Sequence, residues 1–193
     1  MFSKEFVNQT IEILKSLDHS KVEIIVEELK NIKLVNGRLF ICGIGGSAGH
    51  ASHAVNDFRK LAGIESYSPT DNVSEVTART NDEGFETVFE EYLKVSKFNE
   101  NDAIFILSVG GGSKVPPVSL GLIKAIDFVR DKGGKILGIV GRDGGYTSLK
   151  GTEVLTIPNL FPENVTPHTE GIAAIVWHLM VSHPSIKEKP TKW

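Results

Sequence analysis

The sequence predicts an α/β fold built on a parallel β-sheet, because short apolar segments alternate with segments of helical periodicity. The first apolar segment, 39–42, leads into a glycine turn and then into a helix that reaches Phe58. Two continuous apolar runs, 103–107 and 135–140, are likewise followed by glycine-rich turns. Uninterrupted apolar runs are typical of parallel strands that are buried on both faces. Ligands of such sheets bind beyond the carboxyl ends of the strands, so a site is expected at the glycine turns.

Length and charge restrict the class of protein. The 193 residues fit one domain of the usual size, about 100–200 residues, with N-terminal oligomerisation helices in 1–36 and an α/β core in 37–193. A formal net charge of −3, without a long Lys/Arg run, argues against a nucleic-acid partner. No apolar run approaches the ~18 residues that cross a bilayer, and no signal peptide is visible. We therefore expect a cytoplasmic protein that does not contact a membrane.

The N-terminal segment predicts two amphipathic helices. The first covers 3–17, and the second is expected to follow Ser20 as its N-cap. An apolar stripe on the first helix is too rich for a helix that lies alone on a monomer, so it is expected to pack between subunits: Phe6, Ile11, Leu14 and Leu17.

The remaining elements follow from periodicity and from Gly and Pro. Pro116 and Pro117 suit the first turn of a helix that runs to Lys132, where a Gly-Gly pair ends it. The other expected elements are helices over 73–79, 85–95 and 167–182 and a strand over 154–157.

The glycine turn after the first strand predicts an anion site. Gly45 and Gly46 let the backbone bend and approach a ligand, because glycine accepts positive φ and has no Cβ. Ser47 is expected to cap the next helix, whose free N–H groups and positive dipole end favour a phosphate. Ser108 and Ser113 of the second glycine-rich turn would add hydroxyl groups. One compact phosphate is the ligand that these turns favour.

Two other interpretations of these turns stay open. Gly43-x-Gly45-x-x-Ala48 fits a dinucleotide-binding fingerprint, with Glu65 about 20 residues further on as the ribose-binding acid. That acid should end a second strand, whereas Glu65 follows a helix and precedes a loop. Alternatively, the serines serve only as caps and turn residues.

Two predicted helices each carry a polar pair. His53 and Asp57 are four residues apart, and Glu170 and His178 are eight apart, about two turns. Two imidazoles and two carboxylates are a plausible set of ligands for Zn²⁺ or another divalent metal, although either pair alone would fit a solvated helix face. His50, His168 and His183 are expected to face solvent or to support the site. Trp177 and Leu179 are expected to pack in the core or at an interface.

The chain resembles the sugar-isomerase (SIS) family, and within it the phosphoheptose isomerases, in six segments: 42–47, 53–57, 80–82, 108–113, 141–145 and 170–178. The resemblance implies a three-layer αβα sandwich, flavodoxin-like, with a central parallel sheet and an N-terminal helical hairpin. It also implies a homotetramer that interconverts sedoheptulose 7-phosphate and D-glycero-D-manno-heptose 7-phosphate. That reaction supplies nucleotide-activated heptose for lipopolysaccharide or capsule.

The same resemblance implies roles for individual residues. The zinc ligands would be His53, Asp57, Glu170 and His178, and Asp57 and His178 would also be the acid/base pair. The substrate would be held by residues of both glycine turns and by an Asn-Asp pair beside the sugar: Gly45, Gly46, Ser47, Ser108, Ser113, Asn81 and Asp82.

Three departures from the family pattern point to a variant subgroup with a shifted substrate. Asp57 stands where the family has Glu and is shorter by one carbon–carbon bond, roughly 1.5 Å. Glu170 stands where the family usually has Gln, so lost reach is accompanied by added charge. The phosphate loop 108–113 lacks two of the family's hydroxyl groups and is followed by Lys114.

A second class of function stays open. SIS relatives that bind a replication initiator are not enzymes, so this chain could bind a sugar phosphate or a protein partner without catalysis. The presence of both polar pairs favours the enzyme, because a binding module does not need a metal-ligand set.

Overall fold

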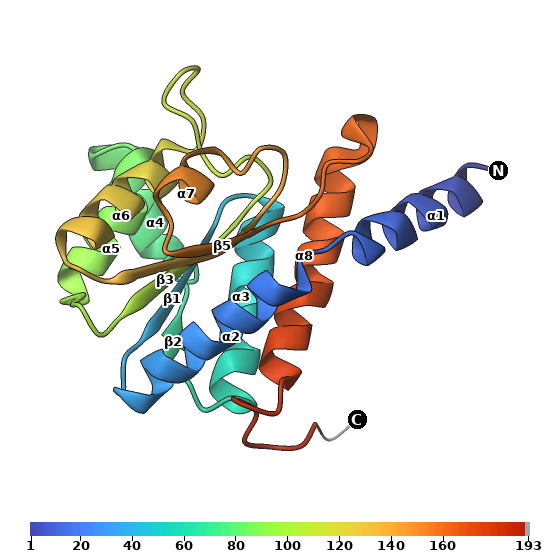
Figure 1. The fold of residues 1–193 in the computed structure, drawn as a ribbon. Helices are drawn as coiled ribbons and strands as arrows, with labels where there is room; N and C mark the ends of the chain where they lie inside the picture. The colour runs from blue at the N-terminus through green and yellow to red at the C-terminus, as the bar shows by residue number, and fades with distance from the viewer. Residues whose placement is uncertain (192–193) are drawn as a thin grey trace.

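Parallel strands alternate with helices from residue 39 onward, as the apolar segments predict (Figure 1). The computed structural model describes residues 1–191. The strands are β1 (Leu39–Gly43), β2 (Ser66–Tyr67), β3 (Ala103–Ser108), β4 (Lys135–Val140) and β5 (Glu153–Thr156). The α-helices are α1 (Phe2–Lys15), α2 (His19–Leu34), α3 (Gly46–Lys60), α4 (Val73–Asp82), α5 (Val88–Val95), α6 (Leu120–Asp131), α7 (Gly145–Lys150) and α8 (Val165–Ser182). Two 3-10 turns, η1 (Phe85–Thr87) and η2 (Pro162–Asn164), precede α5 and α8.

The five strands form one parallel sheet in the order β2-β1-β3-β4-β5. This is the flavodoxin-like order, in which the winding direction changes between β1 and β3. Gly43 at the end of β1 pairs with Leu107, and Ser108 at the end of β3 pairs with Val140. The two predicted glycine turns therefore leave the sheet side by side, at the place where ligands of such sheets bind.

Alternate side chains of β1 enter two different cores. In Figure 1, α2, α3 and α8 lie on one side of the sheet and α5 and α6 on the other. Leu39 and Ile41 pack with the first group of helices, and Phe40 and Cys42 pack with the second. All four are completely buried, which explains the continuous apolar sequence of this strand. Burial also raises the pKa of the Cys42 thiol, so this cysteine packs as an apolar residue.

The two N-terminal helices do not form the expected hairpin. In Figure 1, α1 extends beyond α2 and reaches α8 instead of folding back. The apolar stripe of α2, which includes Ile25 and Leu29, packs on the sheet and is not available to α1. Helix α1 therefore contacts α8. Ile11 of the α1 stripe is exposed, and its other three members are only partly buried. Asp18 caps α2 in place of Ser20, accepting a hydrogen bond from Lys21 N–H at 3.1 Å.

Helix α6 begins later than the prolines predict. Ser113 and Val118 exchange backbone hydrogen bonds of 2.9 Å and close a loop that contains Pro116 and Pro117, so the helix starts only at Leu120. The sequence did not predict β2 or α7, because elements of two and six residues are too short to show a period.

The longest helix, α8, has 18 residues. Within residues 1–191, neither α8 nor any other helix has both the length and the apolar character needed to cross a membrane.

Candidate functional site

Two glycines shape the N-terminus of α3. A Cβ on Gly43 would lie 2.3 Å from the carbonyl oxygen of Ser47, and Gly45 has a φ of 64°, so both positions require glycine. Gly45 is the N-cap, which corrects the expectation that Ser47 caps this helix. Ser47 lies in the first turn and is buried. The helix N-terminus thus follows directly from the end of β1, a geometry that suits an anion.

The turn after β3 is attached to α7. Gly111 and Gly112 have φ values of 66° and 85°, and their carbonyl oxygens accept hydrogen bonds from Thr147 and Tyr146 N–H at 2.9 and 2.8 Å. The Oγ of Ser108 accepts from Gly111 N–H at 3.1 Å. The serines at the two ends of this turn therefore belong to a hydrogen-bonded loop.

Three of the four predicted metal ligands come together. His53 Nε2 lies 3.7 Å from Asp57 Oδ2, and His178 Nε2 lies 3.6 Å from the same oxygen. The three ligand atoms are all within 4.8 Å of one another. These separations are too long for hydrogen bonds and approach the roughly 3.3 Å expected between ligands of a tetrahedral zinc ion. His53, Asp57 and His178, called the metal group below, can therefore hold a divalent metal ion.

A hydrogen bond determines which nitrogen of His178 faces Asp57. Its Nδ1 lies 2.7 Å from the carbonyl oxygen of Ala174, one turn back on α8. Because a carbonyl oxygen only accepts, Nδ1 carries the proton and the lone pair of the neutral ring is on Nε2. Metal-binding histidines commonly donate their other ring N–H in this way. The nitrogen that faces Asp57 is therefore the one able to bind a metal.

Asp57 is the least accessible member of the metal group. Its side chain is 14% exposed, compared with 57% for His53 and 47% for His178. Asn56 Nδ2 donates to Asp57 Oδ1 at 2.8 Å, which leaves Oδ2 facing both imidazoles. One carboxylate oxygen is thus free to bind a metal or to accept a proton.

Glu170 does not join the metal group within one chain. Its Oε1 and Oε2 lie 2.8 and 3.1 Å from the position that a Cβ on Gly46 would take. Glu170 precedes His178 by eight residues on α8, a rise of about 12 Å along the helix. Its carboxylate therefore lies at the predicted phosphate position, beside the start of α3.

The predicted sugar-binding pair is exposed. Asn81 and Asp82 form the C-terminal end of α4, and Asn81 Nδ2 donates to Asp82 Oδ1 at 2.7 Å. The two side chains thus bond to each other at the surface of the chain.

The metal group and the predicted phosphate loop line different hollows. The first has a volume of about 390 Å³ and is lined by His53, Asn56, Asp57, Lys60, Leu61, His178, Val181, Ser182 and Thr191. The second, of about 770 Å³, is lined by Ser113, by neighbouring glycines and by residues of α7. Lys114 also lines it, with its Nζ 3.4 Å from Asp127 Oδ2. Within residues 1–191, Ser113 and the metal group therefore line separate hollows.

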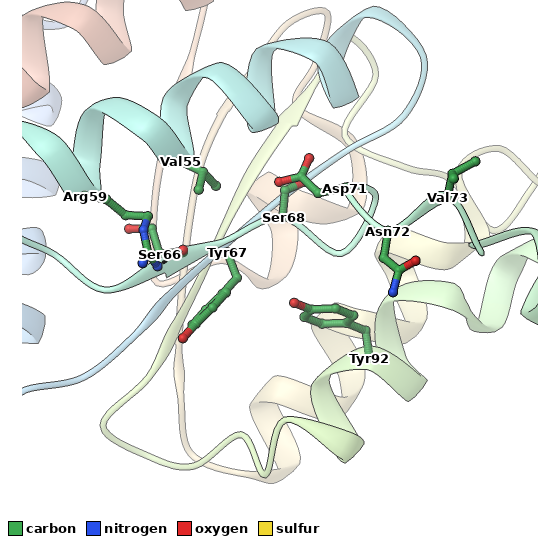
Figure 2. A pocket seen from close by; sticks show the side chains of 9 residues that line it. All are labelled: Val55, Arg59, Ser66, Tyr67, Ser68, Asp71, Asn72, Val73 and Tyr92. Carbon is green, nitrogen blue, oxygen red and sulfur yellow. Dashed lines mark hydrogen bonds between the residues drawn. The ribbon is translucent and has the colours of Figure 1, made fainter. Parts of the chain in front are cut away.

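Another hollow, of about 570 Å³, lies at the open edge of β2 (Figure 2). The rings of Tyr67 and Tyr92 extend toward it from β2 and α5, and Arg59 of α3 donates to the Ser66 carbonyl oxygen at 2.9 Å. Its lining includes none of the predicted catalytic, phosphate or metal residues.

The position of Glu65 argues against a dinucleotide site. Glu65 directly precedes β2, which runs parallel to β1, so it lies at the amino end of the strand. The glycine turn is at the opposite, carboxyl end. The Glu65 carboxylate accepts a hydrogen bond from Tyr67 OH at 2.7 Å. A ribose held by this residue would be on the wrong edge of the sheet.

Two of the remaining histidines have defined partners. His168 does not face solvent but is buried, with Nε2 3.0 Å from Gln9 Oε1 and Nδ1 3.3 Å from Thr10 Oγ1. It therefore connects α8 to α1. His183 Nε2 lies 3.1 Å from Glu23 Oε2, outside the metal group.

Sequence reasoning missed one contact of the metal group. Trp177 is buried in the core, as expected, but its ring also stacks on His178 with centroids 3.5 Å apart. Its ring centroid is 4.9 Å from that of His53, in an edge-to-face arrangement. Adjacency to His178 in the sequence was the available signal.

The fold and the site define a protein of the SIS type. Residues 4–141 match the SIS domain, and the chain belongs to that family. It is 28% identical over 182 residues to the phosphoheptose isomerase of Helicobacter pylori (strain P12), covering 92% of this chain and 87% of that protein. The phosphoheptose isomerase of Rhodospirillum rubrum is 30% identical over 149 residues, covering 75% and 73%.

Another relative has a different name, and a solved structure has a similar fold. The lincomycin biosynthesis protein LmbN of Streptomyces lincolnensis is 32% identical over 155 residues, covering 76% of this chain and 56% of LmbN. The structure of phosphoheptose isomerase GmhA from Neisseria gonorrhoeae superimposes with a TM-score of 0.81 at 20% identity, covering 93% and 95%. The SIS fold predicted from the sequence is thereby confirmed.

Proposed function

We propose that this SIS protein is an aldose–ketose isomerase that converts sedoheptulose 7-phosphate into D-glycero-D-manno-heptose 7-phosphate. The observation that carries the proposal is the metal group, found in a chain related to phosphoheptose isomerases over 92% of its length. Two imidazoles directed at one carboxylate oxygen provide both metal ligands and proton-transfer groups, which binding alone does not require.

Zn²⁺ is the metal we expect, because its usual ligands are imidazole nitrogen, thiolate sulfur and carboxylate oxygen. His53, Asp57 and His178 would hold it. A bound divalent ion acts as a Lewis acid that polarises the oxygens of the reacting carbonyl and hydroxyl groups.

Asp57 and His178 would move the protons of the isomerisation. Asp57 would take a proton from C1 of the ketose and return it to C2, by way of an enediol. His178, whose Nε2 lies 3.6 Å from Asp57 Oδ2, would pass the proton of O1 to O2, so that the carbonyl group moves from C2 to C1. Because Nδ1–H is donated to Ala174, the single lone pair of Nε2 would serve either the metal or this proton at any one moment. Each positioned acid or base is worth about 10²–10⁴ in rate.

Residues at the ends of β1 and β3 would hold the phosphate. Ser47, Ser108 and Ser113 would contribute hydroxyl groups, and Gly45 and Gly46 their backbone N–H groups, at the positive end of α3. The exposed Asn-Asp pair that ends α4 would contact the sugar: Asn81 and Asp82.

A homotetramer with shared active sites would complete this arrangement. Within one chain, Ser113 and the metal group line different hollows, and Glu170 is outside the metal group. The exposed Ile11 on α1 supports contact with another copy. We further propose a cytoplasmic role in making nucleotide-activated heptose for lipopolysaccharide or capsule.

LmbN, whose name differs from that of the phosphoheptose isomerases, is 32% identical to this chain, so identity at this level does not fix the substrate. An assay of several sugar phosphates identifies it. Purified protein is tested on C5, C6 and C7 ketose phosphates, after chelator treatment and again after Zn²⁺ is restored. We expect the highest turnover with sedoheptulose 7-phosphate, loss of activity in chelator and recovery with Zn²⁺.

Elemental analysis should find about one divalent ion per chain. His178→Ala should lose both ion and activity, and His183→Ala, which changes a histidine outside the metal group, should retain both. Calorimetric binding of the sugar phosphates, without isomerisation of any of them, would replace this proposal with the binding-protein interpretation.

A further inference from the structure

Both histidines of the metal group contact one buried indole ring. The Trp177 ring stacks on His178 with an angle of 25° between planes and meets His53 at 75°. Trp177 is 0% exposed, whereas about half of each imidazole side chain is exposed. The indole therefore contacts both imidazoles from the core, while their Nε2 atoms lie 3.7 and 3.6 Å from Asp57 Oδ2.

Hydrogen bonding accounts for the orientation of only one of these imidazoles. His178 donates to Ala174, but His53 makes no hydrogen bond to another residue of the described chain, 1–191. Apart from its approach to Asp57, His53 contacts the rings of Trp177 and His178, the latter at 5.2 Å. Metal-binding histidines are normally oriented through their second nitrogen. For His53, ring contact takes over that function, and the buried Trp177 is the fixed partner.

The chemistry of the indole also indicates a role beyond packing. Among side chains in residues 1–191, Trp177 Nε1 is a buried donor without a hydrogen-bond partner. An unpaired buried donor disfavours folding, and a phenyl ring at this position would avoid that penalty. Indole provides the strongest attraction for a ring that carries positive charge. An imidazole bound to a divalent ion is such a ring.

We propose that Trp177 is a positioning residue of the metal group, whose ring holds His53 and His178 at the spacing that binds a divalent ion. The inference rests on the proposed metal-dependent function and deepens it, because Trp177 acts through the ligands and does not contact substrate.

The first test measures Zn²⁺ affinity by competition with a chelator, without using activity. Trp177→Leu removes the ring and should weaken Zn²⁺ binding about tenfold to a hundredfold, the usual effect of removing a residue that orients metal ligands. Trp177→Phe keeps an aromatic ring and should recover most of that loss.

Met180→Ala is the matched control. Met180 is also completely buried in α8, and its position two residues from His178 places it on the opposite side of the helix. This variant should lower the melting temperature and leave the Zn²⁺ affinity unchanged. A merely structural role of Trp177 would give Trp177→Leu the same result.

The second test uses the indole as its own probe. The chain has two tryptophans, so Trp193→Phe leaves Trp177 as the only one. Its emission should change until one Zn²⁺ per chain has bound, and Co²⁺, which quenches nearby indoles, should quench it. Should Trp177→Leu fail to fold, this titration and the affinity of Trp177→Phe still decide the proposal.

Any of three results would overturn the positioning role. The first is unchanged Zn²⁺ affinity in folded Trp177→Leu, and the second is Trp177 emission that stays unchanged at saturating Co²⁺. The third is wild-type protein that binds neither ion. Zn²⁺ binding that depends on Trp177, in a protein that isomerises no sugar phosphate, would support the positioning role and overturn the proposed reaction.

Discussion

The Glu170 carboxylate lies against Gly46, with Oε1 2.8 Å from the point where a Cβ of residue 46 would be. Gly46 is the first residue of α3, so the carboxylate is at the positive end of that helix. Opposite charges make this contact favourable, and the absence of a side chain at residue 46 makes it possible. The Glu170 carboxylate is thus adjacent to the position that we propose for the phosphate.

Gly46→Ala should separate activity from stability. Gly46 does not have a positive φ, so the first turn of α3 accepts alanine without backbone strain. The added methyl group would displace Glu170, and we expect kcat/KM to fall at least about tenfold while the melting temperature stays the same or rises. Gly49→Ala is the control, because its Cβ would meet nothing within 4 Å. Equal activity of the two variants would show that the Glu170–Gly46 contact has no role in turnover.

The contact between α1 and α8 should weaken in acid. Burial lowers the pKa of His168, which is held by Gln9 and Thr10 and stacked on Phe6 at 4.3 Å, although nearby Glu163 opposes the shift. In the unfolded chain the pKa of His168 is higher, about 6.5. The stability it contributes is therefore complete above that pH and is lost as the pH falls toward the folded-state pKa.

Hydrogen exchange of α1 measures this effect. After correction for the pH dependence of the intrinsic exchange rate, the amides of α1 should be less protected at pH 5 than at pH 7.5. His168→Asn should reduce this difference. Equal protection of α1 at pH 5 and pH 7.5 would contradict the prediction.

Elements with a strong local pattern could be predicted from the sequence. The apolar run 103–107 became β3, and the expected helix over 167–182 became α8 at Val165–Ser182, because burial on both faces and helical period are local signals. The direction of α1 could not be predicted. It depends on α2 already occupying the sheet, a tertiary contact that residues 1–17 do not encode.

The candidate site was predictable to a similar extent. A spacing of four residues placed His53 and Asp57 on the same face of α3, and the structure then brought His178 to them from α8. Glu170 shares the helix of His178, but a rise of about 12 Å and the attraction of the α3 N-terminus separate it from the metal group. Trp177 contacts both histidines through its ring, and its adjacency to His178 was the only sign of this contact in the sequence.

Asp57→Asn tests the proposed base. The substitution keeps the volume and removes the basicity, so turnover should fall by about 10²–10⁴. Asp71→Asn is the control: Asp71 accepts a hydrogen bond from Ser52, also on α3, but lies outside the hollow of the metal group. Asp57→Asn with turnover within a few-fold of wild type would eliminate Asp57 as the base.

Asp57→Glu is the sharper test, because the family resemblance implies Glu at this position. The added methylene moves the carboxylate by roughly 1.5 Å, toward imidazoles that lie only 3.6 and 3.7 Å from Oδ2. We expect this variant to be impaired, and the double variant with Glu170→Gln to recover activity, if the shorter acid and the extra charge compensate each other.

A double-mutant cycle distinguishes compensation from independence. Residues more than about 7–10 Å apart without shared partners usually add within about 0.3–0.5 kcal/mol. Within one chain, Glu170 lies beside Gly46 and outside the metal group, so a monomeric site predicts nearly additive effects.

A coupling free energy above about 1 kcal/mol, measured from kcat/KM, would instead place Glu170 of a neighbouring subunit beside Asp57. The same cycle at protein concentrations below the dissociation constant of the proposed tetramer should then lose its coupling. Coupling that is independent of protein concentration would assign the contact to a rearrangement within one chain.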